Sequence, residues 1–266
     1  MGVVNVTPDS FSDGGRYLRP EAAVAHAKRL LAEGADILDV GGESTRPGAQ
    51  PVPVEEEIGR VLPVIAHLAR AGAVVSVDTR KAAVMRAAID AGAAMINDVT
   101  ALRHDPESLL VAGESDLPVV LMHSQGDPAT MQRRPRYRCA PLDVYDHLEE
   151  RVEAWTKAGF ARERLLIDPG IGFGKTLGHN LQILDALGIY LGLGLPIVLG
   201  VSRKSFIARI GGDVPPEARL PGSVAAALHG IRHGVSIIRT HDVGATRQAL
   251  LVWQALSHQA VACEPV

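Results

Sequence analysis

The chain has 266 residues, of which 47% are hydrophobic and 21% are charged, and its formal net charge is −3. This balance is typical of a globular chain with a sizeable core, in one domain or two. It argues against a nucleic-acid surface, which needs an excess of basic residues, and an aromatic content of 4% leaves few stacking platforms for single strands.

Targeting and membrane signals are not evident in the sequence. The longest apolar runs are too short to span a bilayer, and no basic region followed by an apolar stretch and a cleavage site opens the chain. The two cysteines, Cys139 and Cys263, share no metal-binding spacing, so a reduced cytosolic setting is the simplest interpretation. Because an apolar strand already begins at Met1, we expect some N-terminal residues to be missing from this numbering.

Short apolar runs alternate with amphipathic helical patterns along the whole chain, without a break in composition. The runs that predict strands are 1–6, 37–40, 74–77, 94–98, 119–122, 165–167, 197–201 and 235–238. The patterns that predict helices are 20–34, a helix from 54, 80–91, a helix from 105, 142–158, a helix from about 180, 222–233 and 243–256. In the fourth of these, Asp105 is expected as the cap and Pro106 as the first helical residue.

Eight strand–helix units of this kind predict a parallel sheet, and eight over about 250 residues predict a closed (β/α)₈ TIM barrel. We expect one domain over residues 1–266, with long active-site loops after the first and second strands. An open doubly wound sheet is the alternative, but no dinucleotide-binding fingerprint follows the first strand.

Most of the predicted strands end in a polar, function-prone side chain. In a barrel these ends gather on one face, where the chemistry takes place. Each residue alone has a plainer interpretation as a turn former or a solvated charge, but their repetition at strand ends is hard to attribute to accident. The set is Asn5, Asp39, Asp78, Asn97, His123, Asp168, Lys204, Arg239 and His241.

The segment 165–176 combines an apolar strand, a terminal carboxylate and three alternate glycines. It invites comparison with a nucleotide phosphate-binding loop, but Pro169 stands where that motif requires its first glycine. Glycines suit a backbone that lies close to something flat or charged. The context therefore favours a flat ligand over Gly172 and Phe173, although a turn capped by Asp168 is the plainer alternative.

Asp168 and Asn97 are expected to face each other across the barrel mouth. A carboxylate accepts hydrogen bonds from an amino group and a ring N–H, while an amide both donates and accepts. The pair would suit the guanidine-like edge of a pterin or a guanine. A hydrogen-bonded polar plug in the barrel is the alternative.

Arg239, His241 and Asn5 come from the last and first strands, which become neighbours when a barrel closes. Arginine binds phosphate in a bidentate manner, and phosphate sites in this fold often lie after the last strands. Asn5 could supply an oxygen ligand to Mg²⁺, which shares few protein ligands with substrate phosphates. We therefore predict an anion site here, against the alternative that His241 is structural; for His123 both interpretations remain open.

Two polar loops, after Asn5 and after Val40, are longer than a compact barrel needs. We interpret them as mobile lids, with plain surface loops as the alternative. The residues that they would bring to the site are Asp9, Phe11, Thr45, Arg46 and Pro47.

These motifs together resemble the dihydropteroate synthase family of the folate pathway. The long ones are Asn5-Val-Thr-Pro-Asp-Ser-Phe-Ser-Asp-Gly-Gly and Asp39-Val-Gly-Gly-Glu-Ser-Thr-Arg-Pro-Gly, and the shorter ones lie at 76–79, 96–98, 122–123, 168–175, 200–205 and 239–243. They follow the family's order along nearly the whole chain. Members usually carry a short segment before the first strand, and its absence here puts the closure of the barrel bottom in question.

The resemblance implies that 6-hydroxymethyl-7,8-dihydropterin diphosphate and p-aminobenzoate condense to 7,8-dihydropteroate and diphosphate. It implies pterin ligands at Asp78, Asn97, Met122, Asp168 and Lys204. Asn5, Arg239 and His241 would bind diphosphate with Mg²⁺, for which Asn5 would be the metal ligand. Thr45, Arg46, Pro47, Phe173, Lys204 and Ser205 would form the aminobenzoate pocket, which Asp9 and Phe11 complete as a lid.

Asp78, Lys204, Arg239 and His241 are the residues expected to act in catalysis. Loss of diphosphate would leave a cation at the pterin methylene, so we expect a dissociative displacement without a strong base. Sulfonamides, which mimic aminobenzoate in this family, are expected inhibitors, and a cytoplasmic homodimer is expected from the family alone. The alternatives are a pterin-dependent methyltransferase acting between methyltetrahydrofolate and a corrinoid, and a catalytically silent binding or regulatory paralogue.

Overall fold

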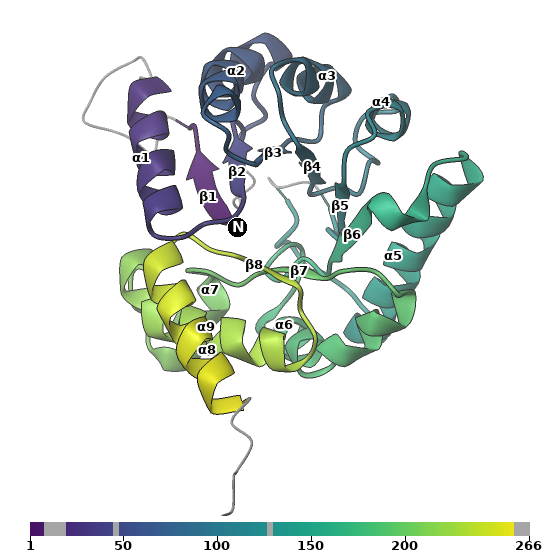
Figure 1. Ribbon diagram of the computed structural model, residues 1–266. Coiled ribbons are helices and arrows are strands. Elements are labelled where there is room, and N and C mark those ends of the chain that lie inside the picture. The colour runs from purple at the N-terminus through teal and green to yellow at the C-terminus, as the bar shows by residue number, and fades with distance from the viewer. Residues whose placement is uncertain (8–19, 45–47, 127–129, 258–266) are drawn as a thin grey trace, which may run out of the picture.

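The predicted strands form the centre of the molecule and helices surround them (Figure 1). The computed structural model describes residues 1–7, 20–44, 48–126 and 130–257. Within these ranges the strands are β1 (Gly2–Asn5), β2 (Leu38–Gly41), β3 (Val75–Asp78), β4 (Met95–Asp98), β5 (Val119–Met122), β6 (Leu165–Asp168), β7 (Val198–Gly200) and β8 (Ile237–Arg239). All lie close to the predicted runs, because each run is apolar and ends at a polar residue or a turn former.

The sheet closes on itself. Strands β1 to β6 pair in chain order as parallel neighbours, and β7 pairs with β8. Parallel bridges join Ile167 to Ile197 and Gly2 to Thr240, and the amide of Val3 donates to the carbonyl of Thr240 at 3.0 Å. These contacts link β6 to the segment before β7 and β8 to β1, so the fold is the predicted (β/α)₈ barrel and the open-sheet alternative is wrong.

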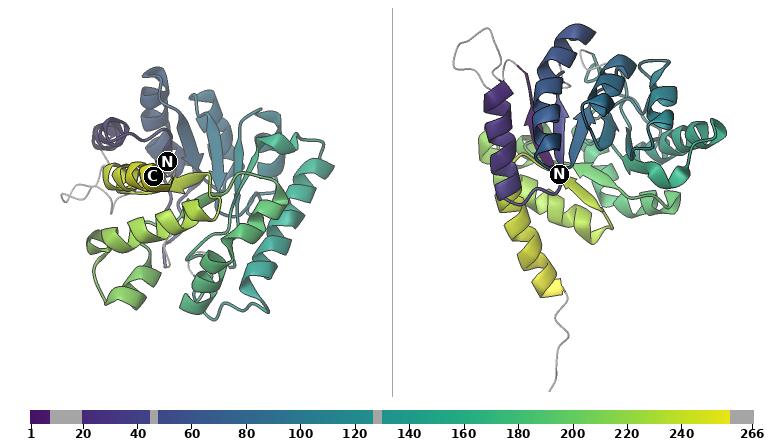
Figure 2. Two further views of the ribbon diagram at one scale, coloured as in Figure 1. Left: turned by 60° about the horizontal axis from the view of Figure 1, so that its bottom comes forward. Right: turned by 45° about the horizontal axis from the view of Figure 1, so that its top comes forward.

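The α-helices pack around the barrel, and α1 and α2 lie side by side on the outside of β1 and β2 (Figure 2). In the described part of the chain they are α1 (Pro20–Ala32), α2 (Val54–Arg70), α3 (Ala82–Asp90), α4 (Ser108–Glu114), α5 (Ala140–Lys157), α6 (Leu177–Asp185), α7 (Ser205–Gly211), α8 (Leu220–Arg232) and α9 (Val243–Ser257). Short 3₁₀ turns lie at η2 (Arg162–Arg164), η3 (Leu187–Leu193) and η4 (Pro216–Arg219). None of the described helices is long and apolar enough to cross a membrane.

The start of α4 differs from the prediction. The helix begins at Ser108, whereas Asp105 and Pro106 were expected to be its cap and first residue. The side chain of Asp105 instead accepts from the amide of Ala82 at 2.9 Å, with its other oxygen 3.0 Å from the amide of Glu107. Asp105 thus satisfies an unpaired N–H at the start of α3, a helix that lies beside α4.

Two further differences concern α6 and α7. Helix α6 begins at Leu177, earlier than the predicted start near Asn180, because Thr176 and His179 form a reciprocal capping box. Helix α7, which has seven residues and begins at Ser205, is not among the predicted helices. Asn180 is therefore within a helix, and its side-chain oxygen accepts from the amide of Gly172 at 2.7 Å.

Side chains alternate along each strand between the outer core and the barrel interior. The outer residues join one large apolar cluster under the helices. The inner residues form a small separate cluster of Met1, Met95, Val120, Leu166 and Val198. The next inward positions toward the carboxyl ends include the polar side chains of Asp39, Asn97, Asp168 and Arg239, so the interior becomes more polar along the barrel axis.

A buried ion network lies behind the ends of β2 and β3. The ammonium of Lys81 donates to Glu43 at 2.6 Å, to the carbonyl of Val52 at 2.6 Å and to Glu57. Arg80 also donates to Glu43, at 2.7 Å. The side chain of Lys81 is 10% exposed and that of Glu57 is 1% exposed, so solvent screens this network little.

We predict that Lys81→Met destabilises the fold by about 3–5 kcal/mol, because it leaves two buried carboxylates without their shared cation. The matched control is Lys157→Met, which removes an exposed pair with Glu153 and should cost less than about 1 kcal/mol. Urea unfolding followed by circular dichroism measures both values. Equal losses in the two variants would contradict a stabilising role for the network.

Candidate active site

Polar side chains meet inside the barrel at the carboxyl ends of the strands. Strand register places Asn5 opposite Gly41, Gly41 opposite Asp78, and Asp78 opposite Asn97. Residues that are in register on parallel strands point to the same side of the sheet. The sequence-predicted residues Asn5, Asp78 and Asn97 are therefore brought together in one inward-facing row.

Arg239 stands at the centre of this group. Its Nε donates to Asp39 at 2.6 Å and its Nη2 donates to Asp78 at 2.7 Å. Asn97 completes the cluster by donating to Asp39 at 3.1 Å. Burial works against the charge of Arg239, but the two carboxylates outweigh it and hold the pKa of the guanidinium above its ordinary value.

The two carboxylates share one cation, and the pKa of Asp78 is raised. Burial, together with the negative charge of Asp39, raises the pKa of Asp78 to about 7, even though Arg239 opposes the shift. Asp39 is fully buried, and its Oδ1 has no hydrogen-bond partner among the described residues. The cluster therefore has unused acceptor capacity facing the interior.

Asp39 is a central member of the site. Its position at a strand end is evident from the sequence, but its role as an acceptor is not, because its partner Arg239 is 200 positions away in the chain. The same strand-end signal that singled out Asp78 and Asp168 would have included it.

A second group lies across the interior on β6 and β7. Asp168 is buried, and its Oδ1 accepts from the amide of Gly170 at 2.7 Å. Burial raises its pKa, and the nearby charge of Lys204 opposes that shift. Met122 on β5 is in register with Asp168 on β6 and is 4% exposed, so it lies beside Asp168 on the same side of the sheet.

Lys204 connects this group to the loop after β6. Its ammonium donates to the carbonyl of Ile171 and lies 4.7 Å from the ring centroid of Phe173. Burial lowers the pKa of Lys204 to about 8, while Asp168 favours the charged form. Ser205 follows at the start of α7 and is exposed.

His241 and Asn5 lie on neighbouring strand ends, as the closed barrel requires. The Nδ1 of His241 is 3.0 Å from the hydroxyl of Ser202, which also accepts from the His241 amide at 3.1 Å. Arg239 belongs to the same strand end but is also held by Asp39 and Asp78. The predicted anion site and the predicted pterin site are thus contiguous and share one arginine.

The glycines after β6 have a cause within the chain itself. Gly170 has φ +67°, and a Cβ there would lie 1.9 Å from the carbonyl oxygen of His123. Gly174 has φ +62°, and its Cβ would lie 2.3 Å from the carbonyl oxygen of Gln125. Close backbone packing therefore accounts for both positions, whereas the sequence suggested approach to a ligand.

The lid residues Asp9, Phe11, Thr45, Arg46 and Pro47 lie outside the described residues. The described strands that precede them end at Asn5 and Gly41, and the next described helices begin at Pro20 and Val54.

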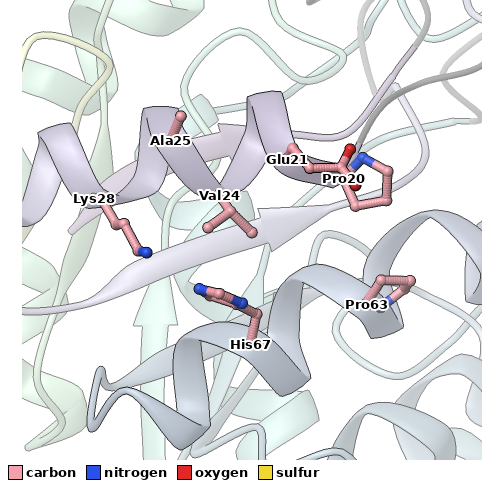
Figure 3. A pocket seen from close by; sticks show the side chains of 7 residues that line it. All are labelled: Pro20, Glu21, Val24, Ala25, Lys28, Pro63 and His67. Carbon is pink, nitrogen blue, oxygen red and sulfur yellow. The ribbon is translucent and has the colours of Figure 1, made fainter.

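Two surface grooves lie apart from this site. One of about 490 Å³ lies between α1 and α2, where Val24 and Lys28 face His67 (Figure 3). Another of about 540 Å³ lies between α6 and α8 and is lined by Leu181 and His229 among others. Both lie between helices outside the barrel, away from the buried charges at its mouth.

Comparison with known proteins supports the same conclusion. Residues 1–241 match the family model described as pterin binding enzyme. The dihydropteroate synthase of Neisseria meningitidis serogroup C is 47% identical, over 96% of this chain and 92% of that protein.

Solved structures of such enzymes superpose closely on this chain. The Xanthomonas albilineans dihydropteroate synthase with 4-aminobenzoic acid has a TM-score of 0.92 and 52% identity, covering 97% of this chain and 93% of that one. The same enzyme with 7,8-dihydropteroate has a TM-score of 0.88 and 49% identity, at the same coverage. The Yersinia pestis enzyme in a sulfonamide drug complex has a TM-score of 0.92 and 44% identity, covering 97% of this chain and 94% of that one. The chain thus belongs to the pterin-binding enzyme family and, within it, to the dihydropteroate synthases.

Proposed function

We propose that this chain condenses 6-hydroxymethyl-7,8-dihydropterin diphosphate with p-aminobenzoate, giving 7,8-dihydropteroate and diphosphate. The observation that carries the proposal is the buried cluster of Asp39, Asp78, Asn97 and Arg239, opposite Asp168 and Lys204. The similar Xanthomonas albilineans enzyme has been solved with 4-aminobenzoic acid and with 7,8-dihydropteroate, one substrate and the product of this reaction.

The site can recognise a pterin because its carboxylates supply hydrogen-bond acceptors that match the donors on the pterin ring. A pterin presents an amino group and ring N–H donors beside a carbonyl, and Asp168 and Asp78 supply the acceptors. Asn97 can both donate and accept, and Lys204 can donate to the carbonyl or a ring nitrogen. Desolvated carboxylates gain most from such a ligand, because unpaired buried acceptors are costly.

The donors around the anion site fit a magnesium ion that arrives with its substrate. Asn5 offers one neutral amide oxygen beside Arg239 and His241, and no described group of three His, Cys, Asp or Glu side chains is placed to hold a metal. Mg²⁺ commonly takes one or two protein ligands and completes its shell with phosphate oxygens and water. Asn5 would hold it there, and the ion would supply further positive charge to the diphosphate.

The protein's own residues favour a dissociative displacement. Arg239 and His241 stabilise the negative charge that develops on the departing diphosphate, while Asp78 and Asp168 stabilise the electron-poor pterin. The arylamine is neutral and nucleophilic, so it can add without a strong base. Phe173, Lys204 and Ser205, with the lid residues, would shape the aminobenzoate pocket, which a sulfonamide would also occupy.

We further propose that the chain works as a cytoplasmic homodimer. Apolar side chains remain exposed on α6, α7 and α9, at Leu181, Ile210, Leu251 and Val252. Burying them against a second copy would favour association, and light scattering that gave the mass of one chain would contradict it. The exposed free Cys139 suits a reducing compartment.

The direct test is diphosphate release from the dihydropterin diphosphate at fixed Mg²⁺, with and without p-aminobenzoate. Release coupled one-to-one to dihydropteroate is expected. Pterin binding without coupled product would overturn the proposal and would point to the methyltransferase or the silent paralogue, which methyltetrahydrofolate binding and methyl transfer would then separate.

We predict that Arg239→Ala lowers kcat by about a hundredfold or more, since one preorganised donor at developing charge is worth about 3 kcal/mol. Steady-state kinetics with both substrates measure the loss. Arg247→Ala, which removes an exposed arginine bonded to Gly34, is the control and should change kcat little. A loss below about threefold in Arg239→Ala would refute its role in stabilising the departing diphosphate.

We predict that kcat/KM for the pterin diphosphate rises as the pH increases through about 7, the pKa of Asp78. Below that value Asp78 is protonated and accepts poorly from a ring N–H, and above it the carboxylate is available. The diphosphate of the substrate also titrates, so the same profile is measured for Asp78→Asn. The prediction is wrong if wild type and variant show the same rise.

A further inference from the structure

Lys175 is a buried cation that the sequence did not single out. The residue is 2% exposed, yet among the described residues its ammonium bonds to no carboxylate and instead has an imidazole and backbone carbonyls as partners. Nζ lies 2.8 Å from Nδ1 of His123 and 3.3 Å from that residue's carbonyl oxygen. It donates to the carbonyl of Gly170 at 2.9 Å and to that of Phe173 at 3.1 Å.

Burying the ammonium of Lys175 costs free energy, so its hydrogen bonds must stabilise the surrounding structure in return. Burial lowers the pKa of Lys175 well below its ordinary value, with Asp168 acting in the opposite direction. Burial and the positive charge of Lys175 likewise lower the pKa of His123, which keeps that ring neutral and able to accept. The result is one polar cluster that joins the end of β5 to the turn after β6.

The turn 170–174 is held in place by this cluster. Lys175 bonds to carbonyls near both ends of the turn, and Gly170 and Gly174 lie against the carbonyls of His123 and Gln125. The hydroxyl of Tyr137 adds a bond to the carbonyl of Gly174 at 2.9 Å. The turn therefore has little freedom relative to β5.

The same turn also contacts Lys204. The carbonyl of Ile171 accepts from the ammonium of Lys204, and the ring of Phe173 lies under it. A Cβ on Gly172 would lie 3.3 Å from Cδ of Lys204, so the aliphatic stem also rests on the turn. Lys175 and Lys204 thus both contact the same five-residue turn, Lys175 through the carbonyls of Gly170 and Phe173 and Lys204 through that of Ile171 and the Phe173 ring.

We propose that Lys175 is a positioning residue for substrate binding. By fixing the turn 170–174 against His123, it sets the place of Lys204 and Phe173 without touching the substrate itself. This inference rests on the proposed function, because it takes Lys204 to be a pterin ligand.

The test is a double-mutant cycle on the full chain. Calorimetric Kd values for 6-hydroxymethyl-7,8-dihydropterin diphosphate are measured for wild type, Lys175→Met, Lys204→Ala and the double variant. If Lys175 acts through Lys204, Lys175→Met weakens binding about tenfold in wild type but less than about threefold when Lys204 is already absent. Equal effects in both backgrounds would overturn the proposal.

Arg164 provides the matched control. It precedes β6 at the opposite end of the strand, and its guanidinium also bonds to several backbone carbonyls, those of Ala112, Gly113 and Leu117. Arg164→Met should lower the melting temperature but change the pterin Kd by less than about twofold, because the loops that it holds do not face the site. Comparable weakening by Arg164→Met would mean that general loosening of the fold, not positioning, explains the effect.

A second variant and a separate activity measurement allow the double-mutant cycle to decide between the outcomes. Should Lys175→Met fail to fold, Lys175→Gln retains a neutral donor and enters the same cycle. Failure of the proposed function is separately visible, since the wild type would then show no coupled product with p-aminobenzoate, whatever the result of the cycle. If the wild type makes product and the cycle is additive, the inference about Lys175 alone is wrong.

Discussion

The site depends on one guanidinium placed between two carboxylates inside the barrel. Arg239 on β8 bonds to Asp39 on β2 and Asp78 on β3, so it links the last strand to two early ones across the interior. Burial, together with the charge of Asp39, raises the pKa of Asp78, and one cation shared by two carboxylates does not fully offset that shift. The same deficit makes the site a good receptor for a flat ring with N–H donors, because such a ligand supplies what Arg239 alone cannot.

Much of this arrangement was predictable, because a parallel barrel converts sequence position into spatial position. Asn5, Asp78 and Asn97 were identified separately as strand ends, and register places them in one row. Side-chain pairing was not predictable in the same way. Asp39 had the right position, but nothing local shows that its oxygen accepts from an arginine 200 residues away.

The predicted starts of α4 and α6 differ from the structure because of the bonds that two capping side chains make. Aspartate is a residue type that favours helix caps, and the side chain of Asp105 does accept from a helix N–H. That N–H lies at the start of α3 and not of α4. Thr176 caps α6, which moves that helix start away from the predicted Asn180. For Asp105 the sequence indicates a capping residue, while the N–H that it satisfies is decided by tertiary packing; Thr176 caps its own helix by a local bond that was not predicted.

Two cations that flank β6 show why residue type alone does not indicate function. Arg164 is half-buried and Lys175 is buried, and both bond to backbone carbonyls, with no ion pair to a carboxylate in the described part of the chain. Their chemistry is alike, but Arg164 holds loops at the amino end of β6, whereas Lys175 holds the turn on which Lys204 rests. In a barrel the end of the strand decides the difference, because only the carboxyl end faces the polar interior. The lysine after the glycines is therefore better understood as part of the internal support of the binding site than as an exposed charge on a flexible loop.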